Sequence, residues 1–304
     1  MSKNIHTKKA WTASRTKDLF YDVLIYLFIA IVCLTCLLPF IHVVSKSISS
    51  EAYVSTKQVF LLPKGLTFEA YEKVFNDASI ITSMYVTVIM TILFTVLGMV
   101  ITILAAYPLS RPGLKGRKVI NFIFIFTMYF AGGMIPDYLL INNLGLLETM
   151  WSLVLPLAFS AYNLVIMKNS LESSIPESLI ESARIDGASH YTILGRIVIP
   201  LSKPIIATVT LFYAVGRWNA YSDAMFYIKQ NTALRPLQLK LYYLLIAATE
   251  AVSGSVNDTQ VVRMTDPEIL KSACIVFATF PILCIYPFVQ KYFVQGTMIG
   301  AVKG

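Results

Sequence analysis

The sequence predicts an all-α membrane protein with six transmembrane helices and both termini on the cytoplasmic side. The chain has 304 residues, of which 56% are hydrophobic and 14% charged, whereas a soluble domain carries about 25% charged residues. The apolar residues occur in blocks long enough to cross a bilayer, which takes about 20 residues of helix. The lysines and arginines lie beside these blocks and form no single patch, so the net charge of +8 does not indicate nucleic-acid binding.

A basic, polar tail of residues 1–19 precedes the first hydrophobic block, residues 20–44. This block is longer than the core of a signal peptide, about 7–15 residues, and no cleavage site follows it, so we expect an uncleaved helix. Five further spans are expected at residues 79–108, 119–141, 148–168, 203–226 and 271–292, before a tail of residues 293–304. Gly132, Gly133 and Pro136 interrupt the third span, which must kink or end there.

The orientation follows from the distribution of basic residues. With the N-terminus inside, the inner segments hold 15 lysines and arginines and the outer segments hold 9. Two outer segments are long, residues 45–78 and 227–270. The first contains a short amphipathic helix with Phe68, Tyr71 and Phe75 on one side, and the second contains an apolar stretch that could lie at the membrane surface.

The inner segment at residues 172–203 is predicted to form two helices joined at a glycine. The first would run to about Asp186, where Gly187 permits a turn that most other residues resist. Ser189 would then cap a second helix. The other residues with expected structural roles are Ser173 or Ser174 as the first cap, Pro176 and Glu177 in the first turn, and Pro200 and Pro204 as breaks before the membrane.

This pair of helices would carry two apolar surfaces. Ile193, Ile197 and Leu201 recur every four residues on the second helix, and Ile180 and Ala183 begin a surface of small residues on the first. Such surfaces suit docking into a protein cleft. They would equally suit packing beneath the chain's own bundle, and physical reasoning leaves both interpretations open.

The same segment closely resembles the EAA loop of bacterial ABC-importer permeases, which reads Glu-Ala-Ala, two residues, Asp-Gly-Ala, and an apolar helix ending Ile-x-Leu-Pro. Here the motif is Glu181-Ser182-Ala183, Asp186-Gly187-Ala188 and Ile197-Val198-Ile199-Pro200, with serine and isoleucine as departures. The stretches GGMIPDYLLINNLGLLETMWSLVLP, GRWNAYSDAMFY and GTMIGAVKG also look like the carbohydrate-type permeases of the maltose and multiple-sugar group. The resemblance therefore covers nearly the whole chain.

The resemblance implies a type I ABC importer permease fold, with a transmembrane domain at residues 20–292, a core permease region at 79–292 and an EAA coupling loop at 172–203. It implies a multi-pass subunit of the bacterial cytoplasmic (plasma) membrane that takes up an oligosaccharide or related glycan and provides half of the translocation pathway. The implied partners are a second, homologous permease subunit in a heterodimer, two ATPase subunits and an extracellular solute-binding protein. ATP and Mg²⁺ would be bound by the ATPase, and this chain would bind no cofactor or metal.

Three sets of residues take roles from this resemblance. ATPase coupling would use Glu181, Ser182, Ala183, Asp186, Gly187, Ala188 and Pro200. The C-terminal tail would contact the ATPase dimer through Gly300, Val302, Lys303 and Gly304. The substrate pathway would include Tyr129, Asn163, Arg217, Trp218, Asn219 and Tyr221, in which the aromatic rings could stack on sugars and Asn219 could bond hydroxyls. Arg217 is the clearest charge within a span, so it should face a cavity, a partner subunit or the outer headgroups.

Two rival classes lack the residues they require. A secondary transporter uses carboxylates at mid-membrane, whereas Asp137 lies beside a helix break and the other acids are in loops. An integral membrane enzyme needs a catalytic set, and neither an HExxH motif nor a Ser/His/Asp arrangement occurs. The chain also lacks the GxxxxGK[ST] loop that would bind ATP. A transporter of this kind must take its energy from another protein.

Overall fold

The computed structural model describes residues 5–252 and 267–301, which form helices joined by short connections and one isolated antiparallel bridge between Ser49 and Leu66. The chain divides into two compact units. The first unit comprises residues 1–74 and 257–276, and the second comprises residues 75–256 and 277–304. The last helix, α15 (Pro267–Ala301), contributes residues to both units.

The first unit contains α1 (Ile5–Ser47), α2 (Glu51–Ser55) and most of α3 (Glu69–Asn76). Residues Tyr21–Ser47 of α1 are long and apolar enough to cross a membrane, which confirms the first predicted span. The hydrophobic side chains of residues 21–39 are exposed, and those of Phe40, Val43 and Val44 are half-buried. The predicted amphipathic helix is α3, and the Tyr71 hydroxyl shares a hydrogen bond of 2.8 Å with Ser47 at the end of α1.

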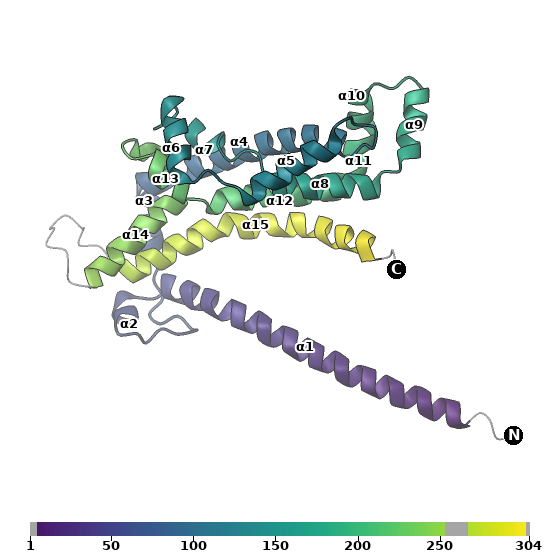
Figure 1. Ribbon diagram of the computed structural model, residues 1–304. Helices are drawn as coiled ribbons and strands as arrows, with labels where there is room; N and C mark the ends of the chain where they lie inside the picture. Colours follow the sequence, from purple (N-terminus) through teal and green to yellow (C-terminus); the bar gives the residue numbers. More distant parts are fainter. Residues whose placement is uncertain (1–4, 253–266, 302–304) are drawn as a thin grey trace. The chain divides into compact units, whose positions relative to one another are not determined.

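The second unit is a helical bundle in which α4 (Ala78–Leu109), α5 (Arg117–Tyr129), α8 (Ala161–Ser174) and α12 (Lys203–Asn219) lie side by side (Figure 1). Phe94, Leu164, Met167, Val209 and Tyr213 are buried between these helices. One end of the bundle carries the short helices α6 (Met134–Asn143), α7 (Trp151–Val154) and α13 (Ser222–Tyr227). The 3₁₀ helix η2 (Thr232–Leu234) and α14 (Leu237–Val252) follow α13.

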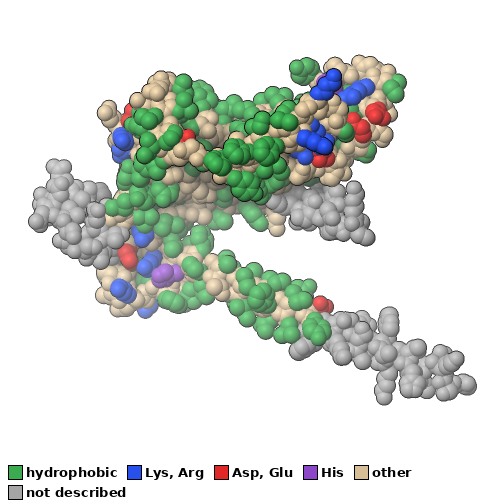
Figure 2. All heavy atoms as spheres, in the orientation of Figure 1, with side chains coloured by type: hydrophobic (Ala, Val, Ile, Leu, Met, Phe, Trp, Pro, Cys, Tyr) green, Lys and Arg blue, Asp and Glu red, His purple; other side chains and the backbone are tan. Residues whose placement is uncertain are grey.

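The opposite end of the bundle carries α9 (Glu177–Ile185), α10 (His190–Ile193), the π-helix η1 (Leu194–Val198) and α11 (Ile199–Leu201). Figure 2 shows hydrophobic side chains over the middle of this unit and lysines and arginines gathered toward the end with α9 and α10. This distribution is the one expected of a bundle whose middle lies in lipid and whose ends lie in water.

The described residues include three helices long and apolar enough to span a membrane, or up to five if each of two bent helix pairs is one span. One bent pair is α5 and α6, which meet at 109°. The interruption predicted at Gly132 and Gly133 is therefore confirmed, and Gly133 has a φ of +91°, which favours glycine. The other bent pair joins residues 190–201 to α12 at 84°.

The prediction of one continuous helix over residues 148–168 is wrong. Residues 155–160 separate α7 from α8, and Ser160 caps α8 by accepting a hydrogen bond from the Asn163 amide at 3.3 Å. The chain has room for this break because residue 98 of α4 is glycine. A Cβ atom on Gly98 would lie 2.6 Å from the carbonyl oxygen of Ala158. The fifth predicted span likewise ends early, at Asn219, because Ala220 is extended.

Candidate functional site

The first part of the candidate site is the segment of residues 177–201, from α9 to α11, here called the elbow. Its turn is a Schellman motif at the end of α9. Gly187 has a φ of +81°, its amide donates to the Arg184 carbonyl at 2.9 Å, and the Ala188 amide donates to the Ala183 carbonyl at 2.9 Å. The Ser189 hydroxyl accepts from the Thr192 amide and caps α10. The predicted glycine turn and the predicted Ser189 cap are both confirmed.

The predicted start of the first helix is wrong. Ser173 and Ser174 end α8, and α9 begins at Glu177 after Pro176. The cause is the Ile175–Pro176 pair, because a residue before proline is pushed into extended backbone. Ile175 has φ −120° and ψ 105°, and its side chain is buried in the bundle core.

The elbow is fixed to the bundle by apolar packing and by one ion pair. Ile180, Ala183, Ile193 and Val198 are buried in the same core cluster as the bundle residues. Arg111, which follows the end of α4 and is 6% exposed, donates to Glu177 at 3.2 Å. The bundle therefore holds the elbow through both of its helices, and most of the predicted apolar ridge packs against the chain itself. A force on the elbow would pass directly to α4 and α12.

The tip of the elbow is exposed, with apolar side chains on both sides of the turn. Ile185 is 86% exposed and Tyr191 is 83% exposed. Of the predicted coupling residues, Ala183 faces the core, Ala188 is half-buried, and the exposed ones are Glu181, Ser182, Asp186, Gly187 and Pro200. Of the predicted tail contacts, Gly300 lies near the end of α15, whereas Val302, Lys303 and Gly304 lie outside the described residues.

A cleft of about 960 Å³ lies between the elbow and the end of α4. Its polar lining includes both signs of charge, from Arg111, Glu177, Glu181, Arg184 and other residues. The Nη2 atom of Arg111 is buried and has no hydrogen-bond partner in the described part of the chain. The predicted coupling residue Glu181 thus belongs to a charged cleft and also to the exposed surface.

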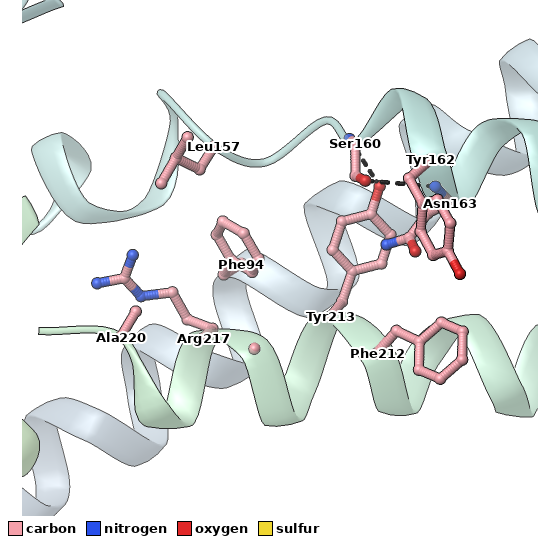
Figure 3. A pocket seen from close by; sticks show the side chains of 10 residues that line it. Phe94, Leu157, Ser160, Tyr162, Asn163, Phe212, Tyr213, Arg217 and Ala220 are labelled. Atoms are coloured by element: carbon pink, nitrogen blue, oxygen red, sulfur yellow. Dashed lines mark hydrogen bonds between the residues drawn. The ribbon is translucent and has the colours of Figure 1, made fainter. Parts of the chain in front are cut away.

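The second part of the candidate site is an open pocket of about 460 Å³ on the bundle, here called the bundle cavity (Figure 3). It lies beside the break between α7 and α8, with Ser160 from the break and Asn163 from the first turn of α8, and its wall includes Phe94 from α4 and Tyr213 from α12. Tyr213 holds the break in place, since its Oη accepts from the Ser160 amide at 3.0 Å and shares a 2.7 Å hydrogen bond with Thr102. Non-helical backbone at membrane depth is tolerated where protein covers it or where it lines a cavity.

Arg217 lines the bundle cavity from the last turn of α12, and Figure 3 shows its side chain extending away from Ser160 and Asn163. It is 2% exposed and forms a two-point ion pair with Asp223 of α13, at 2.5 Å from Nη1 and 3.2 Å from Nη2. Its guanidinium also lies 5.6 Å from the Phe94 ring centroid. Asp223 therefore compensates the charge of Arg217 within the chain, and the Arg217 side chain does not extend toward the lipid headgroups.

The Arg217–Asp223 pair lies between two cavities. Asp223, together with Asp137 and Tyr227, lines a cavity of about 650 Å³ among α6, the segment that follows α7, and α13. Arg217 lines the bundle cavity, and Leu157 lines both. The ion pair and Leu157 therefore join the linings of the two cavities.

The structure brings two of the six predicted pathway residues together, Asn163 and Arg217, which share the bundle cavity. Trp218 is buried and donates from its indole nitrogen to the Ala278 carbonyl at 3.1 Å. Tyr221 stacks on Tyr242 with ring centroids 4.9 Å apart. The other two predicted residues are exposed: Asn219 donates to the Val215 carbonyl of its own helix, and Tyr129 ends α5.

Sequence reasoning missed Phe94, Ser160, Tyr213 and Asp223. Asp223 could have been predicted from the sequence. It follows Arg217 by six residues and is the nearest acidic residue in the sequence to this arginine, which needs a counter-charge if it is buried. The other three depend on the break between α7 and α8, and the apolar sequence around it resembles a continuous span.

Comparison with known proteins supports these observations. Residues 98–299, more than half of the chain, match the family described as binding-protein-dependent transport system inner membrane component. The chain belongs to this family. The elbow lies within the matched region, and so does every lining residue of the bundle cavity except Phe94. Together with the relatives described next, this match confirms the predicted resemblance to carbohydrate-type ABC importer permeases.

Two relatives from Bacillus subtilis (strain 168) are similar to this permease over nearly its full length. The polygalacturonan/rhamnogalacturonan transport system permease protein YtcP is 41% identical and covers 95% of this chain and 100% of its own. Protein LplC is also 41% identical and covers 99% of both chains. A solved bacterial ABC transporter involved in the import of the acidic polysaccharide alginate contains a chain with 36% identity and a TM-score of 0.80, covering 91% of this chain and 98% of its own.

Proposed function

We propose that this permease is one half of the membrane channel of an ATP-driven importer for acidic oligosaccharides, in the cytoplasmic membrane of a bacterium. It pairs with a second, homologous permease subunit, receives solute from an extracellular binding protein and is driven by two ATPase subunits. ATP and Mg²⁺ are bound by those subunits. In the proposed topology the broken α7–α8 segment is the sixth crossing, beside the five candidate spans, and both termini are cytoplasmic. The elbow then lies on the side where the ATPase resides.

The single observation that carries the coupling role is the construction of the elbow. Its inner face is packed into the bundle core, and its tip presents Ile185, Tyr191 and the exposed motif residues Glu181 and Asp186. To shift a gate from 1:99 to 99:1, a partner must supply about 5.5 kcal/mol of differential binding free energy. A rigid elbow can transmit that energy because its helices pack on the same bundle that lines the cavity.

The substrate class is supported by the proteins that this chain resembles. The relative named for polygalacturonan and rhamnogalacturonan is 41% identical, and the transporter named for alginate is 36% identical. All three polymers contain uronate units. The bundle cavity adds a physical argument, since Asn163 and Ser160 offer polar groups for sugar hydroxyls beside the aromatic rings of Phe94 and Tyr213. Passage between the two cavities then requires the Arg217–Asp223 region to rearrange.

The test is uptake into proteoliposomes that contain both permease subunits and the ATPase, with binding protein and labelled trigalacturonate outside. We expect uptake only when ATP is present inside, and none when a proton or sodium gradient is the only energy source. Uptake driven by an ion gradient would refute the ATPase-coupled mechanism. Uptake of neutral oligosaccharides alone would refute the acidic substrate class and leave the coupling mechanism intact.

A further inference from the structure

A third cavity, of about 300 Å³, lies where the start of α4, the η2 segment and the start of α14 meet. It is here called the Arg235 cavity. Two cations, Arg235 and Lys240, line it together with the ring of Tyr243 and the hydroxyl-bearing side chains of Ser79, Ser83 and Thr232. In the proposed topology it lies on the outer side. It shares no lining residue with the bundle cavity.

No direct ion pair compensates the charge of Arg235 in the described part of the chain, although Glu148, which does not line the cavity, interacts with that charge electrostatically: the Asn231 amide and also the Arg235 guanidinium lower the pKa of Glu148. None of the ion pairs found there involves Arg235. Its Nη2 atom donates to the Lys229 carbonyl at 2.6 Å, and its guanidinium lies 5.4 Å from the centroid of the Tyr243 ring. The Nε atom is buried without a hydrogen-bond partner among the described residues. An arginine fork held in this way has donors left for a carboxylate, its best-matched acceptor.

A separate set of contacts positions Arg235. The carboxylate of Glu148 accepts hydrogen bonds from the backbone amides of residues 229–231, the loop whose Lys229 carbonyl binds Arg235. Oε1 accepts from Lys229 at 2.8 Å and from Gln230 at 3.1 Å, and Oε2 accepts from Asn231 at 2.9 Å. Glu148 itself has a φ of +60°, a conformation that side chains other than glycine adopt rarely. Strained residues of this kind persist where the surrounding structure fixes them. Here the fixed loop holds the guanidinium over Tyr243.

The positive charge of Lys240 is only partly compensated. Its ammonium lies 3.6 Å from Asp77 and donates to the Ser79 hydroxyl. The Asp77 carboxylate is shared, because the same oxygen caps α4 by accepting from the Ser79 amide at 2.8 Å. The lining of the cavity therefore carries two positive charges, and the two carboxylates that interact with them, Asp77 and Glu148, both lie outside the lining. The backbone of this region is also anchored, since the Leu237 amide donates to the Thr87 hydroxyl at 2.8 Å.

We infer that the Arg235 cavity is an entry subsite for one uronate unit of the substrate, with Arg235 and Lys240 binding the sugar carboxylate. This inference rests on the proposed import of acidic oligosaccharides. The volume is at the lower end of the range for small-molecule sites. An acidic protein side chain would use the two cations alone, whereas a uronate also uses the three hydroxyl-bearing residues and the part of Tyr243 that lines the cavity. The mixed lining thus favours a sugar over a protein carboxylate.

The first test probes the cavity without depending on transport. Thr232→Cys is introduced into the assembled transporter, in a background without the native cysteines, and labelled with an anionic or a cationic methanethiosulfonate. We expect the anionic reagent to react about tenfold faster, and Arg235→Gln with Lys240→Gln to remove this preference. Lys229→Gln is the matched control, because its ammonium lies 5.5 Å from the Tyr138 ring and does not line the cavity. Equal rates for both reagents, or loss of the preference in the control, would overturn the inference.

Ligand protection identifies what the cavity binds. Trigalacturonate should slow the labelling of Thr232→Cys, and its fully methyl-esterified form, which lacks the charge, should not. Equal protection by the ester would overturn the role of the carboxylate. Protection by unloaded binding protein, with none by free trigalacturonate, would show that the cavity takes a protein side chain and would also overturn the inference.

Uptake then separates this inference from the proposed function. Arg235→Gln should raise the KM for trigalacturonate about tenfold and leave the KM for the methyl ester unchanged. If the unmodified transporter imports no acidic oligosaccharide, the proposed substrate class fails. If it imports trigalacturonate with an unchanged KM in Arg235→Gln, the subsite fails and the proposed function stands.

Discussion

The ion pair between Arg217 and Asp223 provides a prediction whose magnitude follows from the structure. The side chains are 1% and 12% exposed, and two hydrogen bonds of 2.5 and 3.2 Å join them. Asp223→Asn keeps the shape but removes the negative charge, so the buried guanidinium loses its compensation. Breaking a buried pair on one side costs about 3–5 kcal/mol. Because the Phe94 ring and the Met90 sulfur still contact Arg217, we expect the lower end, about 3 kcal/mol.

The assay is reversible unfolding of the detergent-solubilised chain by sodium dodecyl sulfate, followed by circular dichroism. Asp223→Asn should lower the free energy of unfolding by about 3 kcal/mol. The double variant Arg217→Met/Asp223→Leu removes both charges and should recover to within about 1 kcal/mol of the original, since apolar replacement of a whole buried pair is often neutral. A loss below about 0.5 kcal/mol in Asp223→Asn would place the pair in the range of exposed ion pairs and refute the reasoning.

Three further predictions concern single positions. Gly187→Val should abolish ATP-driven uptake while the protein still inserts, because β-branched residues resist a φ of +81°. Gly187→Asn should keep substantial uptake, because asparagine tolerates this conformation. Equal loss of uptake in both variants would show that the requirement for glycine has a cause other than backbone conformation. Gly98→Ala should cost about 1–3 kcal/mol in the same unfolding assay, since its Cβ would lie 2.6 Å from a backbone oxygen, and Gly132→Ala, with its nearest neighbour at 3.9 Å, should cost less. The amide hydrogen bonds from Asn231, Gln230 and Lys229 lower the pKa of Glu148 below its usual 4.5. The stabilisation from the Glu148 carboxylate is present above that value and is lost as the pH falls through the lowered pKa, so the Glu148→Gln protein should show a smaller acid-induced drop in melting temperature than the original protein. Parallel curves of melting temperature against pH for the two proteins would contradict this.

Local sequence signals predicted the elements whose causes are local. Gly187 and Ser189 were sufficient to predict the turn and the second cap of the elbow, because backbone conformation and capping depend on neighbouring residues. Gly132 and Gly133 predicted the bend between α5 and α6 for the same reason. The family motif located the elbow within the chain. These parts of the fold need no knowledge of tertiary packing.

Features that depend on packing were not predictable in the same way. The break between α7 and α8 is stabilised by Tyr213, more than fifty residues away in sequence, and by the absence of a side chain at Gly98. Residues 148–168 resemble a continuous apolar span because their hydropathy is the same whether the backbone is helical or is a break supported by a neighbouring helix. Ala183 shows a second limit. A family motif identifies the residue, but only the structure shows that it faces the chain's own core.

The most direct test of the account is whether the ATPase covers the tip of the elbow. Ile185→Cys, at a position 86% exposed in this chain, is labelled with a membrane-impermeant maleimide from the cytoplasmic side, after removal of the native cysteines. The control is Lys118→Cys, an exposed position at the start of α5, outside the elbow. The account predicts that adding the ATPase subunits blocks labelling at residue 185 and leaves residue 118 reactive. Equal labelling of residue 185 with and without the ATPase would contradict it.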